Sequence, residues 1–171
     1  MNQSDANTVK PFSRRIIVPS VVLLALAVVA TDFAKSEEAT RVFIFVGQSN
    51  MVGSDAHADH IDDYPLFRGA GVPQDDVRYS YILGNGDEAS QGWKPLQPLS
   101  SFGPELTFAR RVKQQVRSPI AMIKSAVGGT TVAFDWNPDA PDQGQKLYPR
   151  TLRLIRDSLQ DLEKRGVRHR L

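Results

Sequence analysis

Two short, mainly apolar runs constrain this sequence most, because each ends in a turn that contains glycine. The first run is RVFIFV at residues 41–46, and GQSN follows it at 47–50. The second lies within SPIAMIKSAVGGTTV at 118–132, where GGT at 128–130 closes it. Short runs rich in β-branched and aromatic residues are typical of fully buried strands in a parallel sheet. We therefore expect two such strands.

A helix is predicted over residues 102–116, FGPELTFARRVKQQV, between the two apolar runs. Pro104 is well placed as a first helical residue, and Glu105 suits the positive end of the helix dipole. Glu105 is therefore interpreted as a helix-dipole or loop-bracing residue rather than an acid catalyst. The expected apolar face has helical spacing: Leu106, Ala109, Val112 and Val116.

A second helix is predicted over residues 151–166, TLRLIRDSLQDLEKRG. Thr151 is a candidate N-cap and Gly166 a candidate stop. The expected apolar stripe consists of Leu152, Ile155, Leu159 and Leu162. The residues VRHRL that follow at 167–171 indicate the approach to a further strand.

The order of these elements predicts an α/β domain, because strand, loop and helix occur twice in succession. Such an order favours a parallel sheet. Residues 54–102 are rich in Asp, Gly, Pro and Ser and read as irregular, apart from a possible strand at VRYSYIL, 77–83. A loop region of this length inside a compact domain is usually functional or disordered.

Length and composition exclude several classes of protein. A chain of 171 residues with a formal net charge of +2 suits one domain, and its basic residues are scattered. Nucleic-acid binding requires a basic face with interleaved aromatic residues, so we expect no nucleic-acid partner. The chain has no cysteine, which excludes disulfides, thiolate catalysis and cysteine-ligated zinc.

The N-terminus indicates export. Three basic residues precede the apolar run IIVPSVVLLALAVVA at 16–30, namely Lys10, Arg14 and Arg15. This pattern is typical of a signal peptide over residues 1–30, and the run is short for a membrane span. We expect a periplasmic or extracellular protein, and the alternative is an uncleaved N-terminal membrane anchor. A polar leader, residues 31–40, precedes the predicted domain at 41–171.

Ser49 is the candidate nucleophile. Reacting groups in parallel α/β sheets collect beyond the carboxyl ends of the strands, where both glycine-containing turns are expected. Gly47 gives the turn room, Asn50 is suited to bracing the loop, and the Gly128 N–H is suited to binding a developing oxyanion. The alternative is that Ser49 only caps a helix.

Three segments together resemble the sialate O-acetylesterase-like carbohydrate esterases of the SGNH (GDSL-like) hydrolase superfamily: VFIFVGQSNMVG, FGPELTFARRV and IAMIKSAVGGTTVAFDW. The resemblance covers about residues 41–171. It implies a three-layer α/β/α sandwich with a parallel sheet. It also implies an acetylated carbohydrate as substrate, such as acetylated xylan or sialic acid, and no metal or organic cofactor.

The resemblance also assigns roles to residues. It implies that Ser49 is the nucleophile and that the Gly128 N–H lines the oxyanion hole, with Gly129 as the neighbouring candidate. Gln48 and Asn50, on either side of the serine, are then expected on the oxyanion or substrate side. The Gly-Pro-Glu element at 103–105 is expected to start a helix that borders the site.

Two motifs of these esterases have no counterpart in the sequence. One is a Trp-x-Gln-Gly-Glu-x-Asp block, and the other is a late Asp-x-x-His pair that supplies the base and its orienting acid. We therefore expect this chain to represent the N-terminal part of the esterase domain, and to have little or no activity by itself. The alternative is a non-catalytic truncated product that binds carbohydrate weakly.

Other polar and aromatic residues are further candidates for roles in the same site. His57 and His60 lie among aspartates, which suggests a metal site or a surrogate base, but a solvated polar loop is favoured. Trp136 is the best candidate for stacking on a sugar ring, and a packing role is equally compatible with its position. Asp135 beside it is interpreted as a solvated loop carboxylate.

Overall fold

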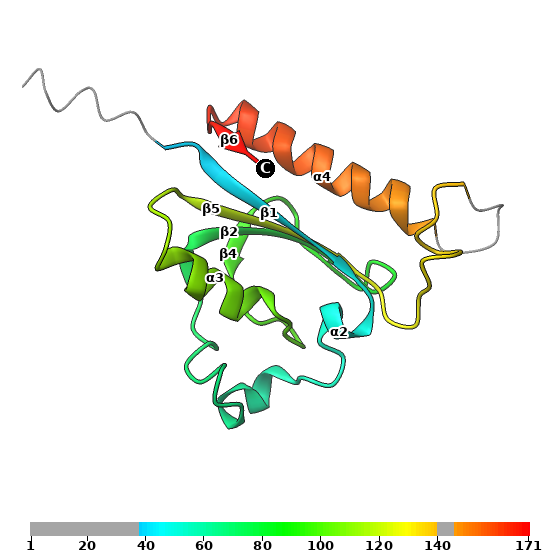
Figure 1. Ribbon diagram of the computed structural model, residues 1–171, viewed down its shortest axis with the longest axis horizontal. Helices are drawn as coiled ribbons and strands as arrows, with labels where there is room; N and C mark the ends of the chain where they lie inside the picture. Colours follow the sequence, from blue (N-terminus) through cyan, green and yellow to red (C-terminus); the bar gives the residue numbers. More distant parts are fainter. Residues whose placement is uncertain (1–37, 140–145) are drawn as a thin grey trace, which may run out of the picture. The chain divides into compact units, whose positions relative to one another are not determined.

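A six-stranded sheet forms the centre of the part of the chain that the computed structural model describes, residues 38–139 and 146–171 (Figure 1). The described residues belong to one unit, Glu38–Leu171. The strand order is β3-β2-β5-β1-β6, and β4 also pairs with β2. In chain order the strands are β1 (Thr40–Gly47), β2 (Gln74–Leu83), β3 (Glu88–Ala89), β4 (Lys94–Leu96), β5 (Ile120–Ala126) and β6 (His169–Arg170).

The sheet is mostly parallel. Strands β2, β5, β1 and β6 run parallel to one another, so the parallel sheet, the predicted strands at 41–46, 77–83 and 118–132 and the one following the last helix are confirmed. Two short antiparallel strands were not predicted, since β3 and β4 pair antiparallel with β2. These strands are two and three residues long, too short for periodicity to reveal within an apparently irregular segment.

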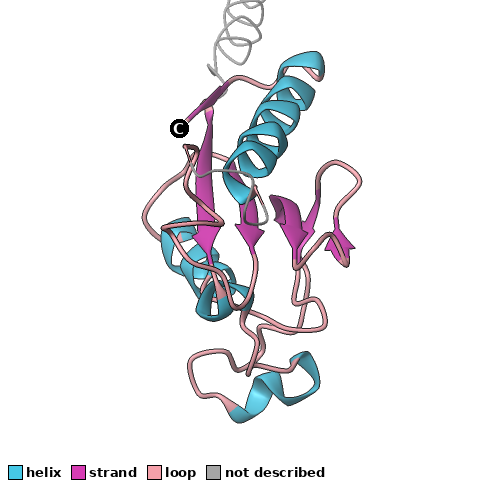
Figure 2. Cartoon of the chain, turned by 90° about the vertical axis from the view of Figure 1, so that its right-hand side faces the viewer, coloured by secondary structure: helices cyan, strands magenta, loops and turns pink. Residues whose placement is uncertain are grey.

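Helices cover both faces of the sheet, which confirms the three-layer α/β/α arrangement. Helix α3 (Glu105–Lys113) packs on one face and α4 (Leu147–Lys164) on the other, as Figures 1 and 2 show. Alternate residues of β1 serve the two layers, since Phe43 packs in the core beneath α3 while Val42 packs beneath α4.

The core beneath α3 is the larger and more aromatic of the two. Leu106 and Ala109 of α3 are fully buried, and Val112 and Val116 pack beside them, as predicted. The Phe108 ring contacts two rings of β1 edge-on, with centroids 5.0 Å from Phe43 and 5.2 Å from Phe45. Pro104 was predicted as the first helical residue, but it is the N-cap and the helix begins one residue later, at Glu105.

The prediction for α4 was wrong at its start and in part of its stripe. The helix begins at Leu147, so Thr151 lies inside it instead of capping it. Pro149 lies in the first turn of this helix, where proline is tolerated. Leu152 is exposed, and polar residues take its place against the sheet: the Thr151 hydroxyl lies 2.7 Å from that of Ser125, and the Ser158 hydroxyl 2.8 Å from that of Ser80.

Gly166 ends α4 as predicted. It has φ +70°, a left-handed conformation that glycine adopts without steric cost, and the next N–H, that of Val167, returns to the Leu162 carbonyl. The chain then reaches β6, where His169 and Arg170 pair with the start of β1.

The expectation that β1 is fully buried is wrong on one face. Ile44 and Val46 are both exposed, on the side of the strand that faces the α4 layer. Helix α4 lies over β5 and β2, as its contacts with Ser125 and Ser80 show. Among the described residues, the helix therefore leaves the side chains of Ile44 and Val46 uncovered.

The predicted signal peptide at 1–30 and most of the predicted leader lie outside the described residues. Within residues 38–139 and 146–171, no helix combines the length and apolar character that a membrane span requires.

Candidate active site

Ser49 is the first residue of the one-turn helix α2 (Ser49–Val52), directly beyond the carboxyl end of β1. The turn into α2 is tight: a Cβ atom at Gly47 would lie 2.8 Å from the Met51 Cβ. A larger residue at position 47 would therefore push α2 away from the sheet. The Ser49 Oγ donates to the Gln48 side-chain oxygen at 3.3 Å, so the hydroxyl lies at the surface of the loop.

A second glycine fixes the other end of α2. Gly53 has φ +87°, and a Cβ atom there would lie only 1.9 Å from the carbonyl oxygen of Phe102. The backbone of α2 therefore touches the segment that leads into α3. The Ser101 hydroxyl, which donates to the Val52 carbonyl at 3.1 Å, adds a hydrogen bond between the two segments.

A buried ion pair lies beneath this contact. The Lys124 Nζ of β5 lies 2.8 Å from Glu105 Oε2, and the side chains are 1% and 3% exposed. The other Glu105 oxygen accepts the Gly103 N–H at 3.1 Å. Burial lowers the pKa of Lys124, and the Glu105 carboxylate opposes that effect. Glu105 thus braces the loop, as the sequence predicted.

Gly103 transmits this bracing to the serine helix. A Cβ atom on Gly103 would lie 2.7 Å from the Met51 carbonyl oxygen and 3.0 Å from the Lys124 Nζ. The backbone of α2, the Gly103 Cα and the ion pair are therefore in direct contact. Packing on the α3 side of the sheet therefore supports the helix that positions Ser49.

Gly128 lies beside Ser49, as expected from the adjacent positions of β1 and β5. A Cβ atom on Gly128 would point toward the site, 3.9 Å from the Ser49 Cβ and 3.7 Å from the Ser54 hydroxyl. The N–H groups of Ser49 and Gly128 make no hydrogen bond within the described residues. They are available to an oxyanion.

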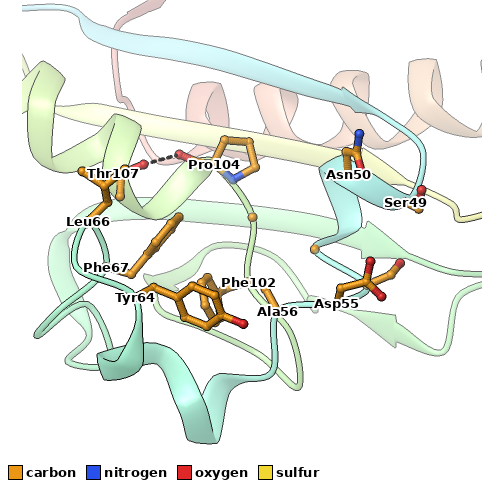
Figure 3. A pocket seen from close by; sticks show the side chains of 13 residues that line it. Ser49, Asn50, Asp55, Ala56, Tyr64, Leu66, Phe67, Phe102, Pro104 and Thr107 are labelled. Atoms are coloured by element: carbon orange, nitrogen blue, oxygen red, sulfur yellow. Dashed lines mark hydrogen bonds between the residues drawn. The ribbon is translucent and has the colours of Figure 1, made fainter.

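A pocket of about 540 Å³ opens beside the serine. Ser49, Asn50 and Asp55 lie at one end, whereas Tyr64 and Phe67 lie at the other (Figure 3). The Phe102 ring connects the aromatic residues, with its centroid 5.8 Å from that of Tyr64 and 4.8 Å from that of Phe67. The pocket thus joins a polar end at Ser49 to an aromatic wall.

The loop that supplies this wall is ordered by contacts with α3 and with residues 100–102. It contains a short 3-10 helix, η2 (Ala58–Asp63), whose Ile61 is buried in the core beneath α3. The Arg110 guanidinium of α3 donates to the carbonyls of Arg68 and Gly69. Part of the segment 54–102, which was predicted to be irregular, therefore forms an ordered wall of the pocket.

The flanking residues of the nucleophile motif are brought to the site in different ways. Gln48 is exposed, and its side-chain oxygen accepts a hydrogen bond from the Ser49 hydroxyl. Asn50 lines the pocket, but its side chain makes no hydrogen bond within the described residues, so the suggested bracing role is not seen there. Gly129 has φ +70° and open space around its Cβ position.

Trp136 does not line the pocket beside Ser49. Its indole N–H donates to the Thr130 hydroxyl at 3.0 Å, and that hydroxyl donates to the Val127 carbonyl at 2.8 Å. The tryptophan therefore supports the Gly-Gly-Thr turn, and its role as a sugar platform stays a prediction. The Asp135 carboxylate accepts the Thr131 N–H at 2.8 Å, a loop-bracing contact.

No histidine is among the described residues that line the pocket. His60 lies at the surface, 3.3 Å from Asp63, and His57 belongs to a backbone bridge with Ser101. Within the described ranges, no group of three or more potential ligands is arranged to hold a metal ion. The described site therefore presents a hydroxyl and two N–H groups without a described partner, and no imidazole among the described lining residues.

Sequence reasoning missed two parts of the site. Lys124 stands alone in an otherwise apolar and small-residue strand, which is a signal for a buried partner such as Glu105. The pocket wall comes from YPLF at 64–67, a local apolar cluster within a polar stretch. The role of this cluster as a pocket wall depends on contacts with Phe102, which the local sequence does not reveal.

One comparison with known proteins shows the family of this chain. No curated protein matches the chain. A solved structure of a protein from Arabidopsis thaliana is similar, with 20% sequence identity and a TM-score of 0.49. The match covers 71% of this chain and 52% of that protein, so the chain spans about half of that relative's length. Residues 39–168 match the family described as carbohydrate esterase, sialic acid-specific acetylesterase, and the chain therefore belongs to this family.

Proposed function

We propose that Ser49 is the nucleophile of a carbohydrate O-acetylesterase, which hydrolyses acetyl esters on sugars such as acetylated xylan or sialic acid. The main support is one juxtaposition in a member of a carbohydrate esterase family. Ser49 and Gly128 follow adjacent parallel strands and lie side by side, and Ser49 lines one end of a pocket. Two unused N–H groups accompany the hydroxyl.

The reaction follows from these groups. The Ser49 Oγ attacks the acetyl carbonyl carbon as its proton passes to a base, and the N–H groups of Ser49 and Gly128 stabilise the oxyanion. Collapse of the tetrahedral intermediate breaks the ester bond, and the sugar hydroxyl leaves after taking up a proton. Water then attacks the acetyl carbonyl carbon of the acetyl-serine as it gives a proton to the base, and the base protonates the Ser49 oxygen as acetate leaves.

The described site limits the expected rate. A serine hydroxyl is a poor nucleophile near neutral pH unless a base is adjacent to it. Asp55 is the only carboxylate among the described lining residues, and none of them has an imidazole. We therefore expect slow turnover by this chain alone, with the base as the missing component.

Acetate release from acetylated xylan tests the proposal. We expect a low rate that Ser49→Ala abolishes and that Ser54→Ala leaves unchanged, because Ser54 lines the same pocket without following β1 directly. Added imidazole, as a replacement base, should raise the rate of the wild type more than that of Ser49→Ala. Equal rates in the wild type and Ser49→Ala, with and without imidazole, would contradict the proposal.

A second candidate function is carbohydrate binding without hydrolysis. The absence of an imidazole from the described lining residues favours it. Under this alternative, acetylated sugars bind with the same affinity to the wild type and to Ser49→Ala, and neither releases acetate in the presence of imidazole.

A further inference from the structure

The two ends of the pocket differ in chemistry. One end presents the Ser49 hydroxyl, the Asn50 amide and the Asp55 carboxylate, whereas Tyr64, Leu66 and Phe67 face them from the other side (Figure 3). An acetyl ester that reacts at Ser49 would therefore have the rest of its structure close to an apolar wall.

The size of the pocket exceeds what the acetyl group needs. Pockets of roughly 300–1,000 Å³ bury whole drug-sized ligands, and this one measures about 540 Å³. The Leu66 side chain is 82% exposed, although the surrounding loop is polar and acidic. Tyr64, which lines the same wall, is 41% exposed, and an apolar patch left in water beside a pocket is a feature of ligand-binding surfaces.

The charge of the lining disfavours acidic ligands. Among the described lining residues there is no lysine, arginine or histidine, and Asp55 supplies a carboxylate. Two cations from the packed elements are already partnered: the Arg110 guanidinium donates to the carbonyls of Arg68 and Gly69, and the Lys124 Nζ pairs with Glu105. A carboxylate-bearing sugar would find a like charge there and no counter-charge.

We propose that this pocket selects neutral esters whose alcohol part has an apolar, ring-sized group, and that it disfavours sugars with a carboxylate. The inference rests on the proposed function, because it places the alcohol part of the ester in the pocket beside Ser49. It narrows the proposed substrates to neutral sugar esters such as those of acetylated xylan, and it differs from the family description, which names sialic acid, an acidic sugar.

Non-reacting glycosides test the pocket independently of catalysis. Three probes isolate the two effects: phenyl β-glucopyranoside, methyl β-glucopyranoside and phenyl β-glucuronide. Their affinities for the whole chain can be measured by calorimetry or by chemical-shift titration. Burial of the phenyl ring should make phenyl glucoside bind about tenfold more tightly than methyl glucoside. The glucuronide should bind about threefold more weakly than phenyl glucoside.

Two exposed variants assign these preferences to residues. Leu66→Ala should reduce the advantage of phenyl over methyl glucoside by about threefold, because it removes part of the apolar wall. Asp55→Asn should bring the glucuronide and glucoside affinities together. Leu152→Ala is the matched control, since Leu152 is an exposed leucine of α4 that does not line the pocket.

The outcomes separate this proposal from the proposed function. Equal affinities for the two neutral glycosides, preferred binding of the glucuronide, or no measurable binding of any probe would overturn the inference. An equal effect of Leu66→Ala and Leu152→Ala would also overturn it. Binding with the expected order but no Ser49-dependent acetate release would support the pocket and contradict only the esterase proposal.

Discussion

The two faces of the sheet are built from different interactions. Beneath α3, aromatic rings surround a fully buried ion pair, Lys124–Glu105. Beneath α4, small hydroxyl pairs such as Ser80–Ser158 replace charges, and the nearby Ile44 remains exposed. The α3 face contacts the loop of Ser49, through Gly103 and Gly53. Changes beneath α3 should therefore alter both stability and the site, whereas changes beneath α4 should alter stability alone.

The largest expected effect comes from breaking the ion pair. Lys124→Met leaves the Glu105 carboxylate buried without its cation, which costs about 3–5 kcal/mol in the free energy of unfolding. Urea denaturation measures this loss. The double variant Lys124→Met/Glu105→Gln should recover much of it, because no charge remains buried.

An exposed ion pair provides the control for this experiment. Lys113 lies 2.6 Å from Asp76 at the surface, and Lys113→Ala should cost no more than about 1 kcal/mol. If Lys124→Met and Lys113→Ala lower the free energy of unfolding by similar amounts, the buried ion pair does not contribute more to stability than an exposed one, which contradicts the prediction.

The next effect concerns the contact between α2 and the α3 layer. In Gly53→Ala, the new Cβ atom meets the Phe102 carbonyl and the left-handed φ is strained, so we expect destabilisation of about 2 kcal/mol or more. Acetylation of Ser49 by an activated ester should slow in parallel. Gly92→Ala introduces the same kind of φ strain with open space around the Cβ, so it should cost only about 1 kcal/mol and leave Ser49 unaffected.

The α3 face should also determine stability at high pH. Burial raises the pKa of Tyr79 far above its ordinary value, and the Glu105 charge adds to this. The folded state therefore keeps the Tyr79 proton above about pH 10, whereas the unfolded state loses it, so stability falls with rising pH by about 1.4 kcal/mol per unit.

Tyr79→Phe should remove this part of the pH dependence. The Tyr79 hydroxyl has no hydrogen-bond partner within the described residues, so stability at pH 7 should stay equal or rise slightly. Denaturation curves at pH 7 and above pH 10 measure both effects. An unchanged slope above pH 10 would show that Tyr79 does not titrate as an interior group.

The smallest effect belongs to the α4 face. Ser158→Ala removes one partner of the hydroxyl pair with Ser80 and should cost about 1 kcal/mol, and the double variant with Ser80→Ala should cost little more. Neither variant should change the acetylation of Ser49. If Ser158→Ala slows acetylation as strongly as Gly53→Ala, the two faces are not independent.

The sequence predicted the elements with strong local signals. The two apolar runs, the helix after Pro104 and the stop at Gly166 follow from periodicity and from backbone preferences that act over a few residues. Ser49 and Gly128 could also be placed together, because adjacent parallel strands bring their carboxyl ends to one edge.

Other features depend on contacts between distant residues. Thr151 was predicted to be a cap because it precedes an apolar stripe, yet its hydroxyl pairs with Ser125 inside the fold. The exposure of Leu152 follows from the same shift in the buried face of α4. The pocket wall at 64–67 could not be predicted, because it depends on the packing of Phe102 against Phe67.

The position of Ser49 as the nucleophile can be tested most directly by acetylation with 4-nitrophenyl acetate, followed by peptide mapping with mass spectrometry. Slow deacylation should allow the acetyl-serine to accumulate. We predict that, among the serine hydroxyls, Ser49 is acetylated well before the exposed Ser54 and Ser100. Acetylation of these three serines at equal rates, or an unmodified Ser49 beside a modified Ser54, would contradict the account.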